Sequence, residues 1–69
     1  MVISNVGEAE PLLMEVQAAK LLNLSPRTLQ NWRVARNGPQ YIRVGRAIRY
    51  RRRDLIAWID ANTVGARPL

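Results

Sequence analysis

The spacing of apolar positions predicts two short helices joined by a tight turn. Between residues 15 and 22, apolar side chains recur at helical intervals, at Ala18, Leu21 and Leu22. Ser25-Pro26 then begins a second helix, because serine accepts a bond from a free backbone N–H and proline is tolerated in the first turn. This spacing is typical of a helix-turn-helix, whose second helix enters the major groove of DNA.

The second helix is expected to run to about Asn37, because an Asn-Gly-Pro sequence there cannot continue a helix. At about 100° per residue, Leu29, Trp32 and Arg36 fall on one side of it. The opposite side is polar apart from a valine and carries Arg27, Gln30, Asn31 and Val34. Such a helix buries a narrow stripe and presents a polar outer face.

Residues 42–50 alternate apolar and arginine positions around Gly45-Arg46, which predicts a β-hairpin with one inward face and one arginine face. A third helix is expected to begin at Asp54 and to end near Asn62. Its core-facing residues are expected to be Leu55, Trp58 and Ile59. The element order predicts a mainly α fold with a small β-hairpin, a winged helix-turn-helix. We expect a flexible arm over residues 1–11, the DNA-binding domain over 12–62 and a tail over 63–69.

Charge separates the middle of the chain from its ends. The chain has 11 basic and 5 acidic residues, a net charge of +6, and the segment 27–53 holds nine arginines and no carboxylate. This distribution predicts one positive face for a polyanion such as duplex DNA or RNA. A solvated basic face or a membrane-surface patch is the alternative. A membrane-surface helix, however, would interleave its arginines with large apolar residues along one helix.

Composition argues against several other classes. The sequence has no cysteine and no histidine, so we expect no disulfide, no thiolate zinc site and no metal or cofactor. There is no glycine-rich phosphate loop and no spaced carboxylate pair beside a nucleophile, so we expect that the chain is not an enzyme. Nothing approaches the ~20 apolar residues of a membrane span. A cytoplasmic, DNA-associated protein without membrane contact is therefore expected.

Residues 12–29 (LLMEVQAAKLLNLSPRTL) are similar to the opening of MerR-like winged-helix domains of the excisionase type. Later markers of that family also occur, at Trp32, Gly45-Arg46, Tyr50-Arg51, Asp54-Leu55 and Trp58. The resemblance covers roughly residues 12–60 and implies a DNA-binding winged helix-turn-helix. Met14 departs from the family, which places Thr or Ser there as a helix cap, at an expected cost of ~1 kcal/mol. We expect no dimerisation coiled coil and therefore a monomer in solution.

On this fold, four residues at the start and outer face of the second helix are expected to reach base edges in the major groove: Arg27, Thr28, Gln30 and Asn31. Arginine can donate two hydrogen bonds to guanine O6 and N7, and Gln or Asn can form two hydrogen bonds with adenine. The wing-tip Arg46 is expected in the minor groove, as the family's wing arginine implies. Phosphate contacts are expected from Ser25, Arg33, Arg36, Arg43, Arg49, Arg51, Arg52 and Arg53.

The remaining aromatic and basic positions are weighed by their surroundings. Trp32 and Trp58 are expected in the core, whereas Tyr41 and Tyr50 are left open between wing packing and phosphate contact. The three arginines 51–53 lie at a helix N-terminus, where the macrodipole disfavours cations, so phosphates are expected to compensate them.

Resemblance to small phage excisionases implies a recombination directionality factor. One such module buries only about 600–1,000 Å² on DNA, so we expect neighbouring copies to bind adjacent sites cooperatively and bend the duplex. In this reading the protein directs a phage integrase, of the tyrosine type, toward prophage excision. The alternative is a small phage or plasmid transcription regulator with the same domain. A protein-interaction module is a third class, but it would not require so many arginines.

Overall fold

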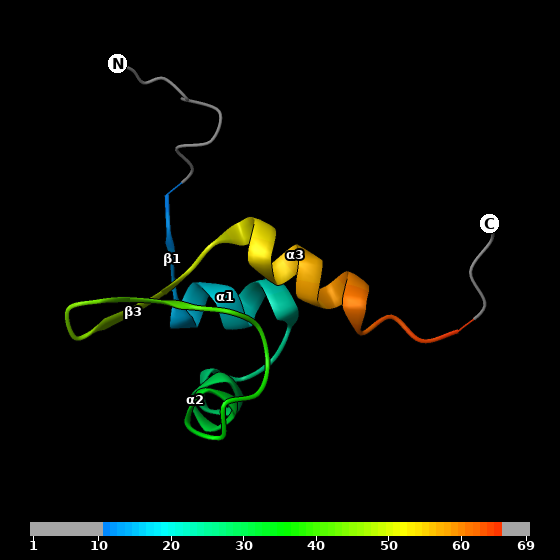
Figure 1. Ribbon diagram of the computed structural model, residues 1–69, viewed down its shortest axis with the longest axis horizontal. Coiled ribbons are helices and arrows are strands. Elements are labelled where there is room, and N and C mark those ends of the chain that lie inside the picture. The colour runs from blue at the N-terminus through cyan, green and yellow to red at the C-terminus, as the bar shows by residue number, and fades with distance from the viewer. Residues whose placement is uncertain (1–10, 66–69) are drawn as a thin grey trace, which may run out of the picture.

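The computed structural model of this 69-residue chain describes residues 11–65 (Figure 1). Three helices and three strands follow one another as β1 (Leu13–Met14), α1 (Glu15–Leu22), α2 (Pro26–Val34), β2 (Ile42–Val44), β3 (Ala47–Tyr50) and α3 (Arg52–Ala61). The predicted winged helix-turn-helix is confirmed. Most of the expected arm and part of the expected tail lie outside the described residues.

Helix α1 lies between α2 and α3 (Figure 1). It ends at Asn23, which takes the left-handed conformation at φ 60°. Helix α2 begins as predicted, because Ser25 is its N-cap and its Oγ accepts a bond from the Thr28 backbone N–H at 3.2 Å. The joint between the helices is thus residues 23–25, and it turns α2 across α1.

A two-residue strand that the sequence pattern does not predict connects the wing to the helices. Strand β1 pairs antiparallel with β3, with Leu13 opposite Tyr50 and Met14 opposite Arg49. The expected two-stranded wing is therefore a three-stranded sheet in the order β1-β3-β2. Because β1 runs directly into α1, the sheet and the first helix are fixed to each other.

Met14 joins β1 to α1 and makes no side-chain cap, as its departure from the family implies. Its backbone N–H instead donates to Gln17 Oε1 at 2.8 Å. Together with the pairing of Met14 and Arg49, this bond holds the start of α1.

The buried core contains one or two residues from each of the four longest elements: Ala18, Ala19, Leu29, Tyr50 and Leu55. Around it pack Leu13, Leu21, Leu22, Trp32 and Ile48, all partly buried. The two tryptophan rings lie 5.2 Å apart between centroids and are tilted by 45°. Ile59 was expected to face the core, but it is 38% exposed.

Helix α2 ends earlier than predicted, at Val34 instead of Asn37. The backbone turns at Arg36, which has a positive φ of 59°, and the Asn37 N–H bonds back to the Trp32 carbonyl at 2.7 Å. Such a left-handed residue with a bond across the last turn is a common way to end a helix. The helical pattern indicated that Arg36 lies on the same side of α2 as Leu29 and Trp32. This prediction is wrong, because the helix ends before Arg36.

Gly38 lies directly on the Trp32 ring. It has φ +83°, and a Cβ built there would be 2.7 Å from Trp32 Cε3. Gly45, at the wing tip, has φ +63°, and a Cβ built there would have no atom within 4 Å. The two glycines share a conformation that costs an L-residue about 1–2 kcal/mol, but only Gly38 also lacks space.

We therefore expect Gly38→Ala to destabilise the domain more than Gly45→Ala, by about 1–3 kcal/mol, the usual cost of overpacking. Urea unfolding followed by circular dichroism measures both variants against the wild type. Equal losses would contradict the close packing of Gly38 on Trp32.

Candidate nucleic-acid interface

The outer face of α2 presents most of the residues expected to read bases. Arg27, Gln30 and Asn31 are exposed. Thr28 is half-buried, and its hydroxyl lies 3.0 Å from Ser25 Oγ in the cap at the start of the helix. Three of the four predicted residues are thus exposed to solvent, and the hydroxyls of Thr28 and Ser25 bond each other.

The wing is a tight hairpin, but the prediction of one apolar face and one arginine face is wrong. Arg43 lies opposite Ile48 and Arg49 lies opposite Ile42, so the two arginines are on different faces of the sheet. Val44 pairs with Ala47, so Gly45-Arg46 forms a two-residue turn, and the positive φ of Gly45 suits such a turn. Arg43 and Arg46 are exposed. Arg49, on the central strand, is half-buried and donates to the Ile48 carbonyl at 2.8 Å.

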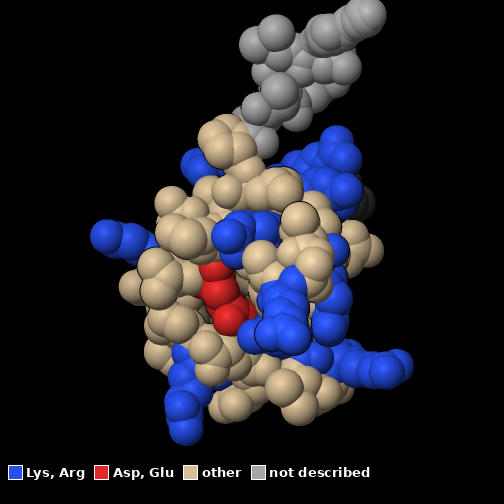
Figure 2. Space-filling model, turned by 90° about the vertical axis from the view of Figure 1, so that its left-hand side faces the viewer, with Lys and Arg blue, Asp and Glu red and all other residues tan. Residues whose placement is uncertain are grey.

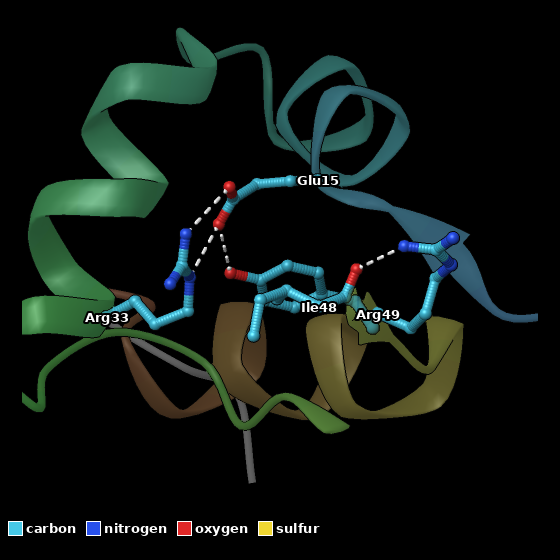
Figure 3. A network of polar contacts seen from close by, with 5 residues as sticks. Glu15, Arg33, Ile48 and Arg49 are labelled. Atoms are coloured by element: carbon cyan, nitrogen blue, oxygen red, sulfur yellow. Dashed lines mark hydrogen bonds and ion pairs between the residues drawn. The ribbon is translucent and has the colours of Figure 1, made fainter. Parts of the chain in front are cut away.

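A carboxylate inside the basic region joins α1, α2 and the sheet. Arg33 of α2 binds Glu15 with two nitrogens, Nε to Oε2 at 3.0 Å and NH2 to Oε1 at 3.1 Å. The Tyr50 hydroxyl of β3 donates to the same Oε2 at 3.0 Å. Figure 3 shows the Glu15 carboxylate between the α2 guanidinium and this hydroxyl. We call these three residues the Glu15 clamp.

The clamp is shielded from solvent, with side-chain exposures of 14% for Glu15 and 22% for Arg33. Burial raises the pKa of the Glu15 carboxyl, but hydrogen bonds from Arg33 and Tyr50 outweigh it, so this pKa lies below 4.5. Burial and the bond to Glu15 raise the pKa of Tyr50 to about 12. The bond to Glu15 also raises the pKa of Arg33. Across the neutral range the clamp is therefore an ion pair with a neutral tyrosine.

The clamp bears on two expectations from the sequence. Arg33 was expected to contact phosphate, yet its charge is balanced within the fold by Glu15. Tyr50, left open between two roles, is a core residue at 1% exposure. Tyr41 is 36% exposed, and its ring centroid lies 6.2 Å from that of Tyr50 and 6.0 Å from the Arg33 guanidinium carbon. Both tyrosines thus pack at the base of the wing.

Sequence reasoning did not find the role of Glu15. The only available signal was a carboxylate in the first turn of α1, twelve residues before the start of the arginine-rich segment. Its partners are 18 and 35 positions away along the chain. No local spacing rule connects residues so far apart.

The three arginines 51–53 lie at the N-terminus of α3, and one of them has a partner within the fold. Arg51 is the N-cap and its NH1 lies 3.1 Å from Asp54 Oδ2. Arg52 and Arg53 are exposed, and within residues 11–65 neither forms an ion pair. Asp54 therefore offsets part of the unfavourable dipole, and two guanidinium groups at this helix end face solvent.

Basic side chains project around the face that holds the wing and α2. Figure 2 shows them around the edge of this face and also in its middle, beside the recessed acidic atoms. The exposed arginines of the described region are Arg27, Arg36, Arg43, Arg46, Arg51, Arg52 and Arg53. This face combines an accessible polar helix with a protruding positive hairpin, the two elements that a winged helix-turn-helix uses on duplex DNA.

Residues 16–63 match a family described as the helix-turn-helix domain. This chain belongs to that family. As a helix-turn-helix domain, it is a DNA-binding module. It is also 44% identical over 61 residues to the transcriptional repressor DcmR of Methylorubrum extorquens. That match covers 86% of this chain and 23% of DcmR. No helix within residues 11–65 of this helix-turn-helix domain is both long and apolar enough to cross a membrane.

We expect Glu15→Gln to lower the free energy of unfolding at neutral pH by about 1.5–3 kcal/mol, the range for hydrogen bonds to charged groups. The folded-state pKa of Glu15 is depressed. Its contribution is therefore present above pH 4.5 and is lost as the pH falls through the folded-state value. Urea unfolding measures the free energy of unfolding of both proteins at pH 7 and at pH 3. The difference between wild type and variant should be smaller at pH 3.

Asp60→Asn is the matched control, because it removes a carboxylate that is exposed on α3. It should change stability little at either pH. A Glu15→Gln difference that stays constant from pH 7 to pH 3 would contradict the clamp.

Proposed function

We propose that this chain is the operator-binding domain of a transcription regulator. The observation that carries the proposal is the Glu15 clamp. It ties α2, through Arg33, and the wing, through Tyr50, to one carboxylate of α1. The two elements that contact DNA are thus held at a fixed distance and angle, as reading a defined sequence requires.

The arrangement suits a duplex with one element in each groove. Helix α2 would enter the major groove with Arg27, Gln30 and Asn31 toward base edges, since all three are exposed. The wing would lie along the adjacent minor groove with Arg46 at its tip. Arg43, Arg52 and Arg53 would neutralise phosphates on either side, which makes binding depend on salt.

The repressor DcmR supports regulation as the biological role, because similarity to it extends over most of this chain. This chain spans only 23% of the length of DcmR. The similarity therefore supports a role for this chain as the DNA-binding part of a regulator.

Prophage excision, with an integrase partner, cooperative copies and DNA bending, stays a prediction of the sequence resemblance. Both roles use the same DNA face, so the location of the binding sites distinguishes them. Operator sites overlap a promoter, whereas excision sites cluster within attachment DNA and fill cooperatively.

The deciding experiment selects binding sequences from a random DNA pool with the purified chain. Affinity is then measured by mobility shift on the selected site, a promoter that contains it and attachment DNA. We expect a preferred sequence, a specific complex at a promoter and repression of a reporter from that promoter. Equal affinity for selected and random DNA would overturn the proposal, and a cooperative ladder on attachment DNA alone would favour excision.

We expect Arg27→Ala to relax base preference at one position of the selected site, at a cost of about 1–3 kcal/mol on the preferred sequence. The reason is that a pair of hydrogen bonds from the Arg27 guanidinium to guanine O6 and N7 discriminates guanine from the other bases. Repeating the selection with the variant measures this effect. An unchanged preference would show that α2 is not placed as proposed.

Arg46→Ala should weaken binding to all sequences alike and lower the slope of log K against log salt by about 1. Lys20→Ala is the control, because it removes one exposed positive charge that lies in the last turn of α1 and not on the wing. Titrations at several salt concentrations compare the two variants. An equal slope change in both would mean that the wing tip makes no particular contact.

A further inference from the structure

Val34 is a conspicuous exception on the polar outer face of α2. Its side chain is 80% exposed, the largest value among the exposed large apolar residues of the helices and strands. We infer that Val34 is a specificity residue that reads the C5-methyl group of a thymine in the major groove. The inference rests on the proposed function and adds one base to what the protein recognises.

The helix geometry places Val34 among the base-reading residues. At about 100° per residue, it lies roughly 20° around the helix axis from Arg27 and between the directions of Gln30 and Asn31. The core stripe points elsewhere, since Leu29 is buried at 1% exposure. A face inserted into the major groove would therefore carry Val34 with it.

The surroundings of Val34 favour a base over a protein partner. On this face the exposed side chains within one helical turn on the N-terminal side are polar, Gln30 and Asn31. Apolar docking surfaces are contiguous patches of several hundred Å², and one valine does not form one. A single methyl group, by contrast, is a ligand that one small apolar side chain can cover, and thymine alone of the four bases presents it.

The spacing along α2 predicts where this thymine lies. Val34 follows Arg27 by seven residues, a rise of roughly 10 Å at 1.5 Å per residue. The base pairs of duplex DNA are stacked 3.4 Å apart along a strand. Because a helix in the major groove is inclined to the DNA axis, the thymine is expected within about three base-pair steps of the guanine that Arg27 contacts.

The test removes single methyl groups from the DNA and the valine from the protein. Each thymine of the selected site is replaced in turn by deoxyuridine, which lacks only the C5-methyl. Dissociation constants are measured for the wild-type chain and for Val34→Ala. We expect one replacement to weaken wild-type binding roughly fourfold, the effect of burying about one methylene, and to leave Val34→Ala unaffected.

Val16→Ala is the matched control, because Val16 is also exposed, at 58%, but lies on α1. It should keep the wild-type response to every replacement. Circular dichroism checks that both variants are folded. If the same replacement weakens wild type and Val34→Ala equally, or if none has an effect, the inference fails while the proposed function stands. If no preferred sequence is selected at all, both fail.

Discussion

The bidentate ion pair between Arg33 and Glu15, with the Tyr50 hydroxyl on the same carboxylate, is the contact on which the DNA-binding face depends. Within residues 11–65 the buried apolar cluster is small, with five residues, and Leu29 is its one member from α2. Directional bonds to one carboxylate constrain rotation as well as distance. The clamp therefore holds the two reading elements, α2 and the wing, in one arrangement on α1.

This arrangement also explains a carboxylate on a face that attracts polyanions. Glu15 lowers the positive potential by one charge, which opposes binding to phosphate. It is nevertheless shielded, with its charge matched by Arg33. The remaining exposed arginines keep the face positive. Glu15 therefore weakens the non-specific attraction to phosphate slightly, but it fixes the positions of α2 and the wing. Fixed positions of the base-reading elements affect specificity more than affinity.

Most of the fold could be predicted because it follows from local rules. Ser25-Pro26 begins α2, and Gly45-Arg46 turns the wing, as expected from capping and turn chemistry. Strand β1 was missed because two residues cannot show an alternation and its pairing with β3 is long-range. The end of α2 was misplaced because Arg36, not Asn37 or Gly38, takes the first left-handed conformation.

The site divides in the same way. Helical periodicity alone places Arg27, Gln30 and Asn31 on one exposed face, whereas the pairing of Arg33 with Glu15 requires the tertiary crossing of α1 and α2. That crossing also changes what a count of arginines means. Of the basic residues in the middle segment, Arg33 serves the fold and Arg51 is partly engaged by Asp54. Charge counted along a sequence thus overstates the charge offered to DNA, because the guanidinium of Arg33 instead holds α2 against α1.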